Sequence, residues 1–308
     1  MSVCRICGCR KVRYVTLEAS HPRENECGKK YKYFFCRDCG CLQEVSFPED
    51  YSKIYAQSYF MNRNGLKSWL WNKYAQYSIT RKGMLGRVIS LIYKPFDYSF
   101  ASLAGKDEPL LDVGCAGGEY LHDLYNNGYS NLTGVDPYMP EGVQSDQITF
   151  IKEDLFTFSK RKKKYKLITL INVFEHLEDP KKVLECLREM VLKDGYVVIL
   201  LPVINPYLWK KFGTSIWNLS PPEHLFIHTI DSMRLLAKEC GFGVSDYYTE
   251  CSSVLWSDKK NMDANRIERN GSRGLISSIG CALLSRKNRK KIDKNKLGNQ
   301  AVFIFRPE

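Results

Sequence analysis

This 308-residue sequence contains no run of apolar residues long enough to cross a bilayer, and its first residues open no apolar secretory leader. We therefore expect an intracellular, cytoplasmic protein. Because that compartment is reducing, the 12 cysteines are expected to bind metal or to be buried rather than to form disulfides. With 44% hydrophobic and 26% charged residues, the composition excludes a wholly disordered, collagen-like or coiled-coil chain and predicts one large domain with a small accessory one.

Acidic residues are fewer than basic ones, and the formal net charge is +12. The excess is concentrated in two short segments, residues 160–166 and 286–296. A nucleic-acid-binding protein would spread basic residues over a whole face, so nucleic acid is not the expected partner and two solvated loops or helix ends are favoured. The alternative is a docking surface for phosphate, on a substrate or on an anionic membrane.

Seven of the 12 cysteines lie in the first 41 residues, where the pattern Cys-x-x-Cys-Gly-Cys occurs twice. Two Cys-x-x-Cys pairs can supply four thiolates to one tetrahedral zinc ion. The predicted ligands of a structural Zn²⁺ are Cys4, Cys7, Cys36 and Cys39. With strands at residues 12–17 and 31–35, residues 1–47 are expected to form a zinc ribbon that needs its metal to fold. The alternatives are redox-active or merely buried cysteines, and Cys9, Cys27 and Cys41 are expected to pack rather than hold a second metal.

Residues 48–107 are expected to link this ribbon to the rest of the chain. Residues 48–65 are interpreted as a connector, and apolar residues at helical spacing predict two amphipathic helices in residues 66–92, broken near Gly83. The aromatic residues of interest in this part are Trp69, Trp71, Tyr93, Phe96 and Tyr98. We expect them to form the outer layer of a core, and the alternative is a belt at a membrane interface.

Strand and helix patterns alternate after residue 108. Strands are predicted at residues 110–113, 132–135, 149–151, 167–171 and 197–201, and helices at residues 119–126, 180–192 and 230–240. This alternation is typical of an α/β domain with a parallel sheet and crossover helices. Two further predicted strands, residues 244–249 and 301–305, enclose an insertion at about residues 252–299.

The turn after the first of these strands has the pattern Asp-x-Gly-x-Ala-x-Gly, formed by Asp112, Gly114, Ala116 and Gly118. A strand that runs through a Gly-rich turn into a helix places a ligand at the carboxyl edge of a sheet. A dinucleotide fingerprint would have glycine at Ala116 and Glu119. The pattern instead resembles the first motif of class I S-adenosylmethionine-dependent methyltransferases. The resemblance implies S-adenosyl-L-methionine as cofactor and, over residues 108–308, a Rossmann-like, doubly wound, seven-stranded, mostly parallel sheet with an antiparallel last strand.

Further segments follow in the order that this family shows. Asp136 ends the second strand, where the family's carboxylate accepts hydrogen bonds from both ribose hydroxyls; the alternative is a helix cap. Asp154 and Leu155 follow the third strand, and the resemblance assigns the first of them to the adenine amino group. Asn172 opens residues 172–180, which resemble the family's segment beside the methionine end of the cofactor.

The acceptor side is expected after the fifth strand. Residues 221–229 resemble a segment that lies over the methyl donor in ubiquinone-type O-methyltransferases and bacterial sugar methyltransferases. A hydroxyl acceptor has to lose a proton, and an imidazole with a pKa near neutrality is a suitable base. His224 is the first candidate for this base and His176 the second; the alternative is that His224 only hydrogen-bonds the lid. Residues 209–229 and the insertion, with its basic run, are expected to cover the methyl donor and to meet a phosphate on the acceptor.

The sequence therefore predicts a methyltransferase of small molecules. We expect O-methylation of a sugar, nucleotide-sugar or lipid-linked saccharide in surface-polysaccharide or natural-product biosynthesis. The expected partners are an acceptor that carries a phosphate or a lipid and, at the periphery, a membrane surface. The alternatives are an RNA methyltransferase, which the absence of an Asn-Pro-Pro-Tyr-like motif disfavours, and a module that binds the cofactor without turnover. The sequence indicates no oligomeric state.

Overall fold

The computed structural model of the chain describes residues 2–19, 28–47, 65–92, 97–216, 219–250 and 295–308. Several predicted features lie outside these residues: Cys27, nearly all of the connector 48–65, Tyr93, Phe96, and most of the insertion with its basic run. None of the helices in the described part of the chain is both long and apolar enough to cross a membrane.

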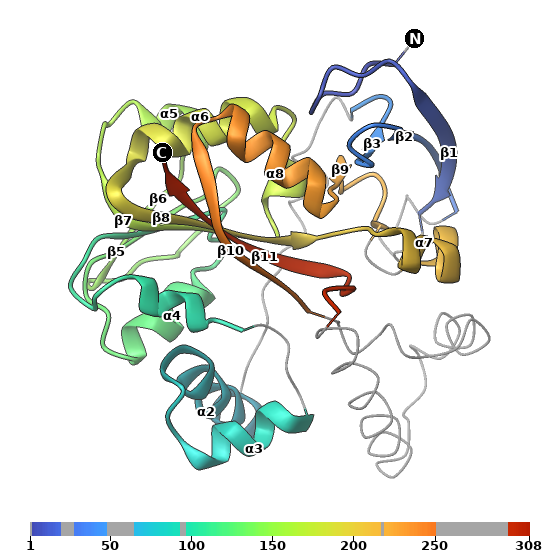
Figure 1. Cartoon of the computed structure of the whole chain (residues 1–308). Helices are drawn as coiled ribbons and strands as arrows, with labels where there is room; N and C mark the ends of the chain where they lie inside the picture. The colour runs from blue at the N-terminus through green and yellow to red at the C-terminus, as the bar shows by residue number, and fades with distance from the viewer. Residues whose placement is uncertain (1, 20–27, 48–64, 93–96, 217–218, 251–294) are drawn as a thin grey trace.

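A seven-stranded sheet forms the centre of the larger part of the molecule (Figure 1). Its strands, in spatial order, are β10 (Phe242–Glu250), β11 (Gln300–Pro307), β8 (Val191–Pro202), β7 (Tyr165–Ile171), β4 (Leu110–Val113), β5 (Leu132–Val135) and β6 (Ile148–Ile151). The neighbouring pairs from β6 to β8 are parallel, whereas β11 is antiparallel to both of its neighbours. The predicted α/β class with an antiparallel last strand is confirmed.

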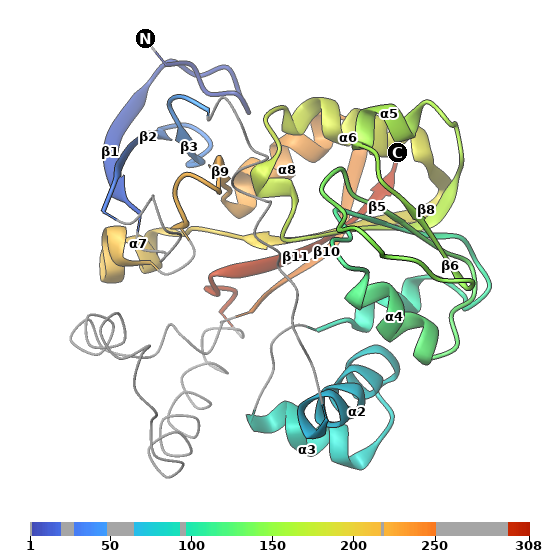
Figure 2. The same ribbon diagram turned by 180° about the vertical axis from the view of Figure 1, so that it is seen from behind.

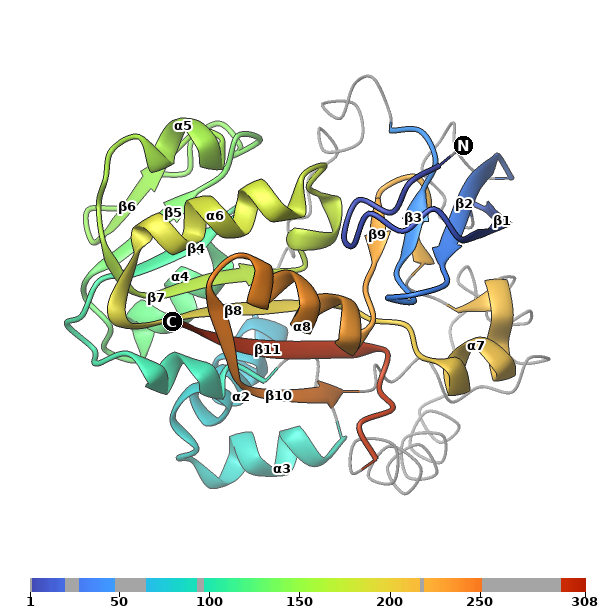
Figure 3. The ribbon, with the colours of Figure 1, turned by 45° about the horizontal axis from the view of Figure 1, so that its top comes forward.

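Helices cover both faces of this sheet (Figures 1 and 3). One face carries α5 (Leu155–Ser159), α6 (Pro180–Met190) and α8 (Ile230–Glu239), and the other carries α4 (Glu119–Asn126), with α2 (Leu66–Thr80) and α3 (Met84–Ile92) beyond it. The two central strands β4 and β5 are buried at every position, as expected for strands of a parallel sheet that is covered on both faces. The two main apolar cores lie on the two faces of the sheet.

Local capping sets where the helices begin. The side chain of Asp179 accepts a hydrogen bond from the Lys182 N–H at 3.0 Å, and proline fills the first position of α6. This helix ends before the predicted residue 192, because Val191 already pairs with Tyr165 in the sheet. No predicted helix covers α7 (Pro206–Phe212), although its cap, Asn205, followed by a proline is a recognisable start signal.

The N-terminal ribbon is a second, smaller sheet made of β1 (Val12–Glu18), β2 (Lys30–Cys36) and β3 (Leu42–Glu44). Its fourth strand, β9 (Phe226–Ile227), comes from the segment that was assigned to the acceptor side, and it pairs with β3 (Figure 2). Side chains of the ribbon and of α7 share one apolar cluster. The ribbon sheet is therefore completed by a part of the chain far from residues 1–47.

The helical hairpin of α2 and α3 is interrupted at residues 81–83, close to the predicted break. Trp71 and Tyr98 are buried against the sheet side, as expected for an outer core layer, whereas Trp69 is half exposed. Three short 3₁₀ segments complete the described structure: η1 (Ser99–Leu103), η2 (Phe174–His176) and η3 (Gly213–Ser215).

Candidate functional site

The Gly-rich turn leaves β4 where the order of the sheet reverses, since the chain continues to β5 on one side and the later strand β7 lies on the other. Ligands bind at such a switch point, beyond the carboxyl ends of the strands. Gly114 has a φ of 72°, and a β-carbon there would lie 2.4 Å from Cγ2 of Val173. Ala116 also has a positive φ, of 48°, a conformation that alanine disfavours.

Asp136 at the end of β5 holds this turn in place. Its carboxylate accepts hydrogen bonds from the Ala116 N–H at 2.9 Å and from the Tyr138 N–H at 2.7 Å. The bond to Ala116 offsets part of the strain of its positive φ. Burial raises the pKa of Asp136 above its ordinary value, and the two backbone donors act in the opposite direction. The structure thus brings Asp136 and the Gly-rich turn together, as the sequence predicts.

Asp112 lies one step further from the ligand edge, within β4. Its carboxyl is buried and accepts a hydrogen bond from Oγ1 of Thr169 on the neighbouring strand β7 at 2.7 Å. Burial raises the pKa of Asp112 to about 7, and the Thr169 hydroxyl partly opposes this shift. In this structure the side chain links two strands beneath the turn.

Asp154 and Leu155 follow β6, but their side chains are engaged locally. Asp154 is exposed and caps α5, since its carboxylate accepts bonds from the Phe156 N–H, the Thr157 N–H and the Thr157 hydroxyl. The Thr157 hydroxyl is the main cause that lowers the pKa of this carboxyl. Leu155 is buried in the core beneath the carboxyl edge of the sheet. The capping role of Asp154 is visible in the sequence as an acidic residue before a helix.

Asn172 directly follows β7 and has a φ of 53°. Its N–H donates to the Leu200 carbonyl at 2.8 Å, and its Oδ1 accepts a hydrogen bond from Nε2 of Gln300 at 3.4 Å. Asparagine tolerates this left-handed conformation better than most residues. The bend that it makes turns the chain into η2 at the same edge of the sheet as the Gly-rich turn.

Three titratable side chains meet just after this bend. The carboxyl of Glu175 is fully buried, and its Oε1 lies 3.9 Å from Nε2 of His176 and 3.9 Å from Nε2 of His224. The two imidazole rings contact each other edge to face, with centroids 4.8 Å apart. Burial raises the pKa of Glu175 to about 8. The sequence predicts the two histidines but assigns no role to the carboxyl between them.

The backbone around His224 is anchored by the ribbon. The hydroxyl of Tyr33 on β2 donates to the His224 carbonyl at 2.8 Å, and the hydroxyl of Thr229 donates to the Cys39 carbonyl at 2.6 Å. The Leu225 N–H donates to the Glu175 carbonyl at 2.9 Å. These bonds place the histidine segment between the ribbon and η2.

The four predicted metal ligands converge beside the start of β1 and the end of β2, where Val12 pairs with Cys36. The Sγ atoms of Cys4 and Cys39 are 3.6 Å apart, those of Cys7 and Cys36 are 3.5 Å apart, and all four lie within 4.8 Å of one another. A tetrahedral ion with bonds of about 2.3 Å needs sulfur atoms about 3.8 Å apart, so the arrangement fits zinc.

The two cysteine repeats also have the same backbone. The Gly8 N–H donates to the Cys4 carbonyl at 2.9 Å, and the Gly40 N–H donates to the Cys36 carbonyl at 3.1 Å. Nε2 of Gln43 donates to Sγ of Cys4 at 2.9 Å, as expected beside a thiolate. Cys9 and Cys41 lie outside the group of four, in agreement with a packing role.

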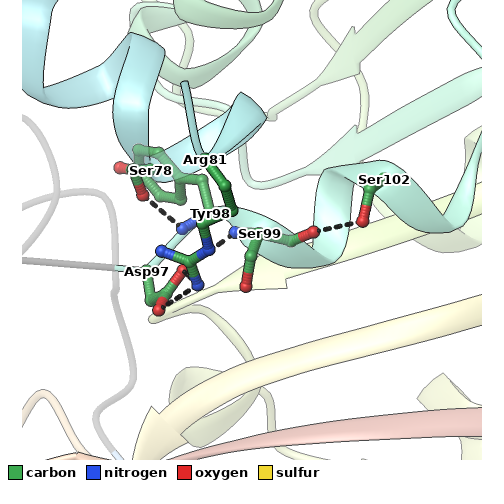
Figure 4. Close-up of polar contacts among 6 residues, drawn as sticks. All are labelled: Ser78, Arg81, Asp97, Tyr98, Ser99 and Ser102. Carbon is green, nitrogen blue, oxygen red and sulfur yellow. Dashed lines mark hydrogen bonds and ion pairs between the residues drawn. The ribbon is translucent and has the colours of Figure 1, made fainter. Parts of the chain in front are cut away.

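A separate cavity of about 190 Å³ lies at the α2–α3 hairpin; its lining residues are Tyr74, Tyr77, Ser78, Arg81, Ser90 and Asp97. Figure 4 shows its polar contacts: the Arg81 guanidinium pairs with the Asp97 carboxylate at 2.6 Å, and the Tyr98 N–H donates to the Ser78 hydroxyl at 2.7 Å. The carboxylate neutralises the one guanidinium of the lining, and no predicted site residue lies there.

Comparison with known proteins gives a consistent match for the part of the chain that forms most of the large sheet. The model of a family described as a methyltransferase domain matches residues 91–246. A ubiquinone biosynthesis O-methyltransferase of Pseudomonas syringae pv. tomato is 30% identical over 135 residues, which are 39% of this chain and 56% of that protein. The protein of the same name from Nitrosospira multiformis is 26% identical over 161 residues, 47% of this chain and 66% of that one. The chain thus spans about half the length of the curated relatives that it matches.

Similar folds occur among solved structures. A SAM-dependent methyltransferase of Archaeoglobus fulgidus is 19% identical, with 65% of this chain and 86% of that chain covered and a TM-score of 0.42. Coclaurine N-methyltransferase bound to N-methylheliamine and SAH is 14% identical, with coverages of 70% and 74% and a TM-score of 0.43.

Proposed function

The chain belongs to the methyltransferase domain family, and on this premise we propose that it transfers a methyl group from S-adenosyl-L-methionine to a hydroxyl of a small-molecule acceptor. One observation carries the cofactor assignment: a turn too tight for a β-carbon at Gly114 leaves β4 at the switch point and is held by the carboxylate of Asp136. Such a turn admits a ligand close to the backbone, and the carboxylate suits a pair of ribose hydroxyls.

The residues proposed to hold the cofactor surround this turn: Asp112, Gly114, Ala116, Gly118, Asp136, Asp154, Leu155 and Asn172. Asp136 is proposed to bind the ribose, and Asp112 to support the turn from below. Asp154 caps α5 with its side chain, so its proposed place at the adenine requires that it serve both purposes. Asn172 lies where the methionine end is expected.

When bound, S-adenosyl-L-methionine supplies an electrophilic methyl group on a sulfonium. The protein then has to align the acceptor hydroxyl and take its proton as the new carbon–oxygen bond forms. We assign the proton to His224, with His176 as its neighbour. In His176 the Nδ1 donates to the Glu223 carbonyl at 2.7 Å and Nε2 faces Glu175, so both ring nitrogens are already directed at protein groups. His224 remains the first candidate for the base.

The acceptor class is proposed on chemical grounds. A sugar, nucleotide-sugar or lipid-linked saccharide remains our first candidate. The names of the curated relatives add a second hydroxyl class, the phenol of a ubiquinone precursor.

The four converging cysteines, Cys4, Cys7, Cys36 and Cys39, are proposed to hold one structural Zn²⁺, and the spacing of their sulfur atoms supports this. The boundaries 1–47, 48–107 and 108–308 remain the proposed division of the chain.

Asp136→Ala tests the cofactor site. Removing the carboxylate leaves the ribose hydroxyls and the Ala116 N–H without their acceptor, so binding of S-adenosylhomocysteine is expected to weaken by about 1–3 kcal/mol in titration calorimetry. Asp146→Ala, an exposed aspartate before β6, is the matched control and should bind as the wild type does. Unchanged affinity in Asp136→Ala would remove this residue from the site.

Methyl transfer itself is tested by mass spectrometry with nucleotide-sugars, lipid-linked glycans and prenylated catechols as acceptors. A mass gain of one methyl group in one class, dependent on the methyl donor and lost in His224→Ala, is expected. Tight binding of S-adenosylhomocysteine with no transfer to any hydroxyl would favour a cofactor-binding module instead.

A further inference from the structure

The carboxyl of Glu175 is the least satisfied polar group near the proposed site. It is fully buried, and within the described residues neither of its oxygens has a hydrogen-bond partner. Leaving a buried carboxyl in that condition is unfavourable, and such groups are rare unless a function requires them. The side chains that face it are the imidazoles of His176 and His224, both at 3.9 Å from Oε1.

A separation of 3.9 Å is too long for a hydrogen bond but short for a pair of charges. The interaction is therefore weak while the histidines are neutral and becomes strong when one of them is protonated. A contact that strengthens as a proton is transferred stabilises the transition state more than the ground state. The low polarity around Glu175 increases this difference.

Both histidines direct Nε2 at the carboxyl of Glu175. His176 is fixed as the Nδ1–H tautomer, because Nδ1 contacts a carbonyl oxygen, and its Nε2 faces Glu175. His224 points Nε2 at the same carboxyl, and it is the residue to which the proposed function assigns the acceptor proton. A carboxylate beside one nitrogen and an acceptor beside the other is the arrangement that makes an imidazole an effective base.

We infer that Glu175 is a positioning residue that orients the imidazole of His224 and balances its charge during methyl transfer. This inference rests on the proposed function. As the acceptor oxygen bonds to the methyl carbon, the carbon–sulfur bond breaks and its electron pair stays on sulfur, which leaves as the neutral thioether. The acceptor proton moves to the imidazole of His224, and the resulting imidazolium pairs with the ionised carboxylate of Glu175.

The other titratable groups around Glu175 are few in the described structure. His176 lies on η2 beside it, and Glu223 precedes His224 and accepts the His176 bond through its carbonyl. His228, after β9, is fully buried, which lowers its pKa to about 3 and keeps it neutral in the working range. Burial raises the pKa of Glu175 to about 8, so its carboxyl ionises and can balance an imidazolium as the pH approaches that value.

The first test needs no acceptor. The chain has five histidines, so the imidazole signals can be followed by NMR and that of His224 assigned with His224→Asn. In Glu175→Gln, which keeps the shape of the side chain, the pKa of His224 is expected to fall because its counter-charge is lost. An unchanged or higher pKa of His224 would overturn the inference, whatever the acceptor proves to be.

The second test uses the acceptor found by the methyl-transfer screen. Glu175→Gln is expected to lower kcat roughly 10- to 100-fold, with the affinity for S-adenosylhomocysteine and the KM of the acceptor nearly unchanged. The acidic limb of its pH–rate profile should move to lower pH. Glu185→Gln, which makes the same change at an exposed glutamate on α6, is the matched control and should retain kcat.

Three results would count against this role. A loss of folding or cofactor affinity in Glu175→Gln, with no shift of the pH–rate profile, would mean that the carboxyl is only structural. A second bound metal ion that disappears in this variant, with activity lost on chelation, would make the three side chains a metal site. Full kcat in Glu175→Gln would exclude the residue from the reaction.

Discussion

Gly114 shows how a single absent β-carbon determines the proposed cofactor site. Its φ of 72° and the 2.4 Å that would separate a β-carbon from Cγ2 of Val173 both require glycine. Gly142 has a similar φ, of 81°, but open space around it. The two positions therefore separate the cost of the backbone conformation from the cost of the clash.

Gly114→Ala is expected to lower the free energy of unfolding by about 3 kcal/mol, since the positive φ and the clash with Val173 add. Gly142→Ala, the matched control, should cost about 1 kcal/mol, for the positive φ alone. Chemical denaturation measures both values, and calorimetry should show weaker S-adenosylhomocysteine binding in Gly114→Ala only. Equal costs at the two positions would mean that the turn relaxes around the new methyl group.

At the scale of elements, the pairing of β3 with β9 connects the ribbon to the acceptor side. The bonds from Tyr33 to the His224 carbonyl and from Thr229 to the Cys39 carbonyl reinforce the same connection. From the sequence alone, the metal is expected to be needed for the folding of residues 1–47. The structure extends this expectation, because the strand that carries on from His224 is part of the ribbon sheet.

Cys36→Ser is expected to remove the metal and to unfold the ribbon, because a small sheet of this kind depends on its zinc. The affinity for S-adenosylhomocysteine should be kept, since the Gly-rich turn lies on the large sheet, whereas methyl transfer should fall at least 10-fold as the His224 segment loses its support. Cys9→Ser, outside the group of four, is the matched control. Metal analysis should give one Zn²⁺ per chain for the control and none for Cys36→Ser.

Two outcomes would contradict this connection. Wild-type methyl transfer in metal-free Cys36→Ser would show that the ribbon does not support the acceptor side. No metal in freshly purified, reduced wild-type protein would remove the zinc assignment itself.

At the scale of the whole molecule, the α2–α3 hairpin exposes apolar side chains at Leu66, Trp69, Leu70, Met84, Leu85, Val88 and Leu91. Met84 and Leu66 are 85% and 71% exposed. An apolar helix face on a protein with a net charge of +12 suits the surface of an anionic membrane, where a lipid-linked acceptor would be found.

Met84→Glu combined with Val88→Glu is therefore expected to lower the fraction of protein that sediments with vesicles of phosphatidylglycerol and phosphatidylcholine. Tyr125→Glu, which changes an exposed apolar residue on α4, is the matched control and should bind vesicles as the wild type does. Binding should also decrease with salt, since charge contributes to it. If wild-type protein does not sediment with these vesicles, the hairpin is not a membrane-docking surface.

The sequence by itself determined the features that depend on neighbouring residues. The spacing of the four cysteines, the turn through Gly114 and Gly118 and the aspartate after β5 are local patterns, and each is where it was predicted. Alternation of strand and helix was sufficient to give the α/β class, because propensity and burial act over a few residues at a time. The precise ends of α6 and β8 were missed, since the pairing of Val191 with Tyr165 overrides the helical pattern.

Only the tertiary structure decided which distant segments meet. Glu175 and His176 are neighbours on η2, whereas His224 precedes β9 and reaches the same carboxyl only through the packing of the chain. The same holds for β9, a strand of two residues that has too little sequence pattern to be recognised but completes the ribbon through backbone bonds to β3. Such contacts depend on how the sheets and loops pack in three dimensions, and the residues next to them in the chain do not encode that packing.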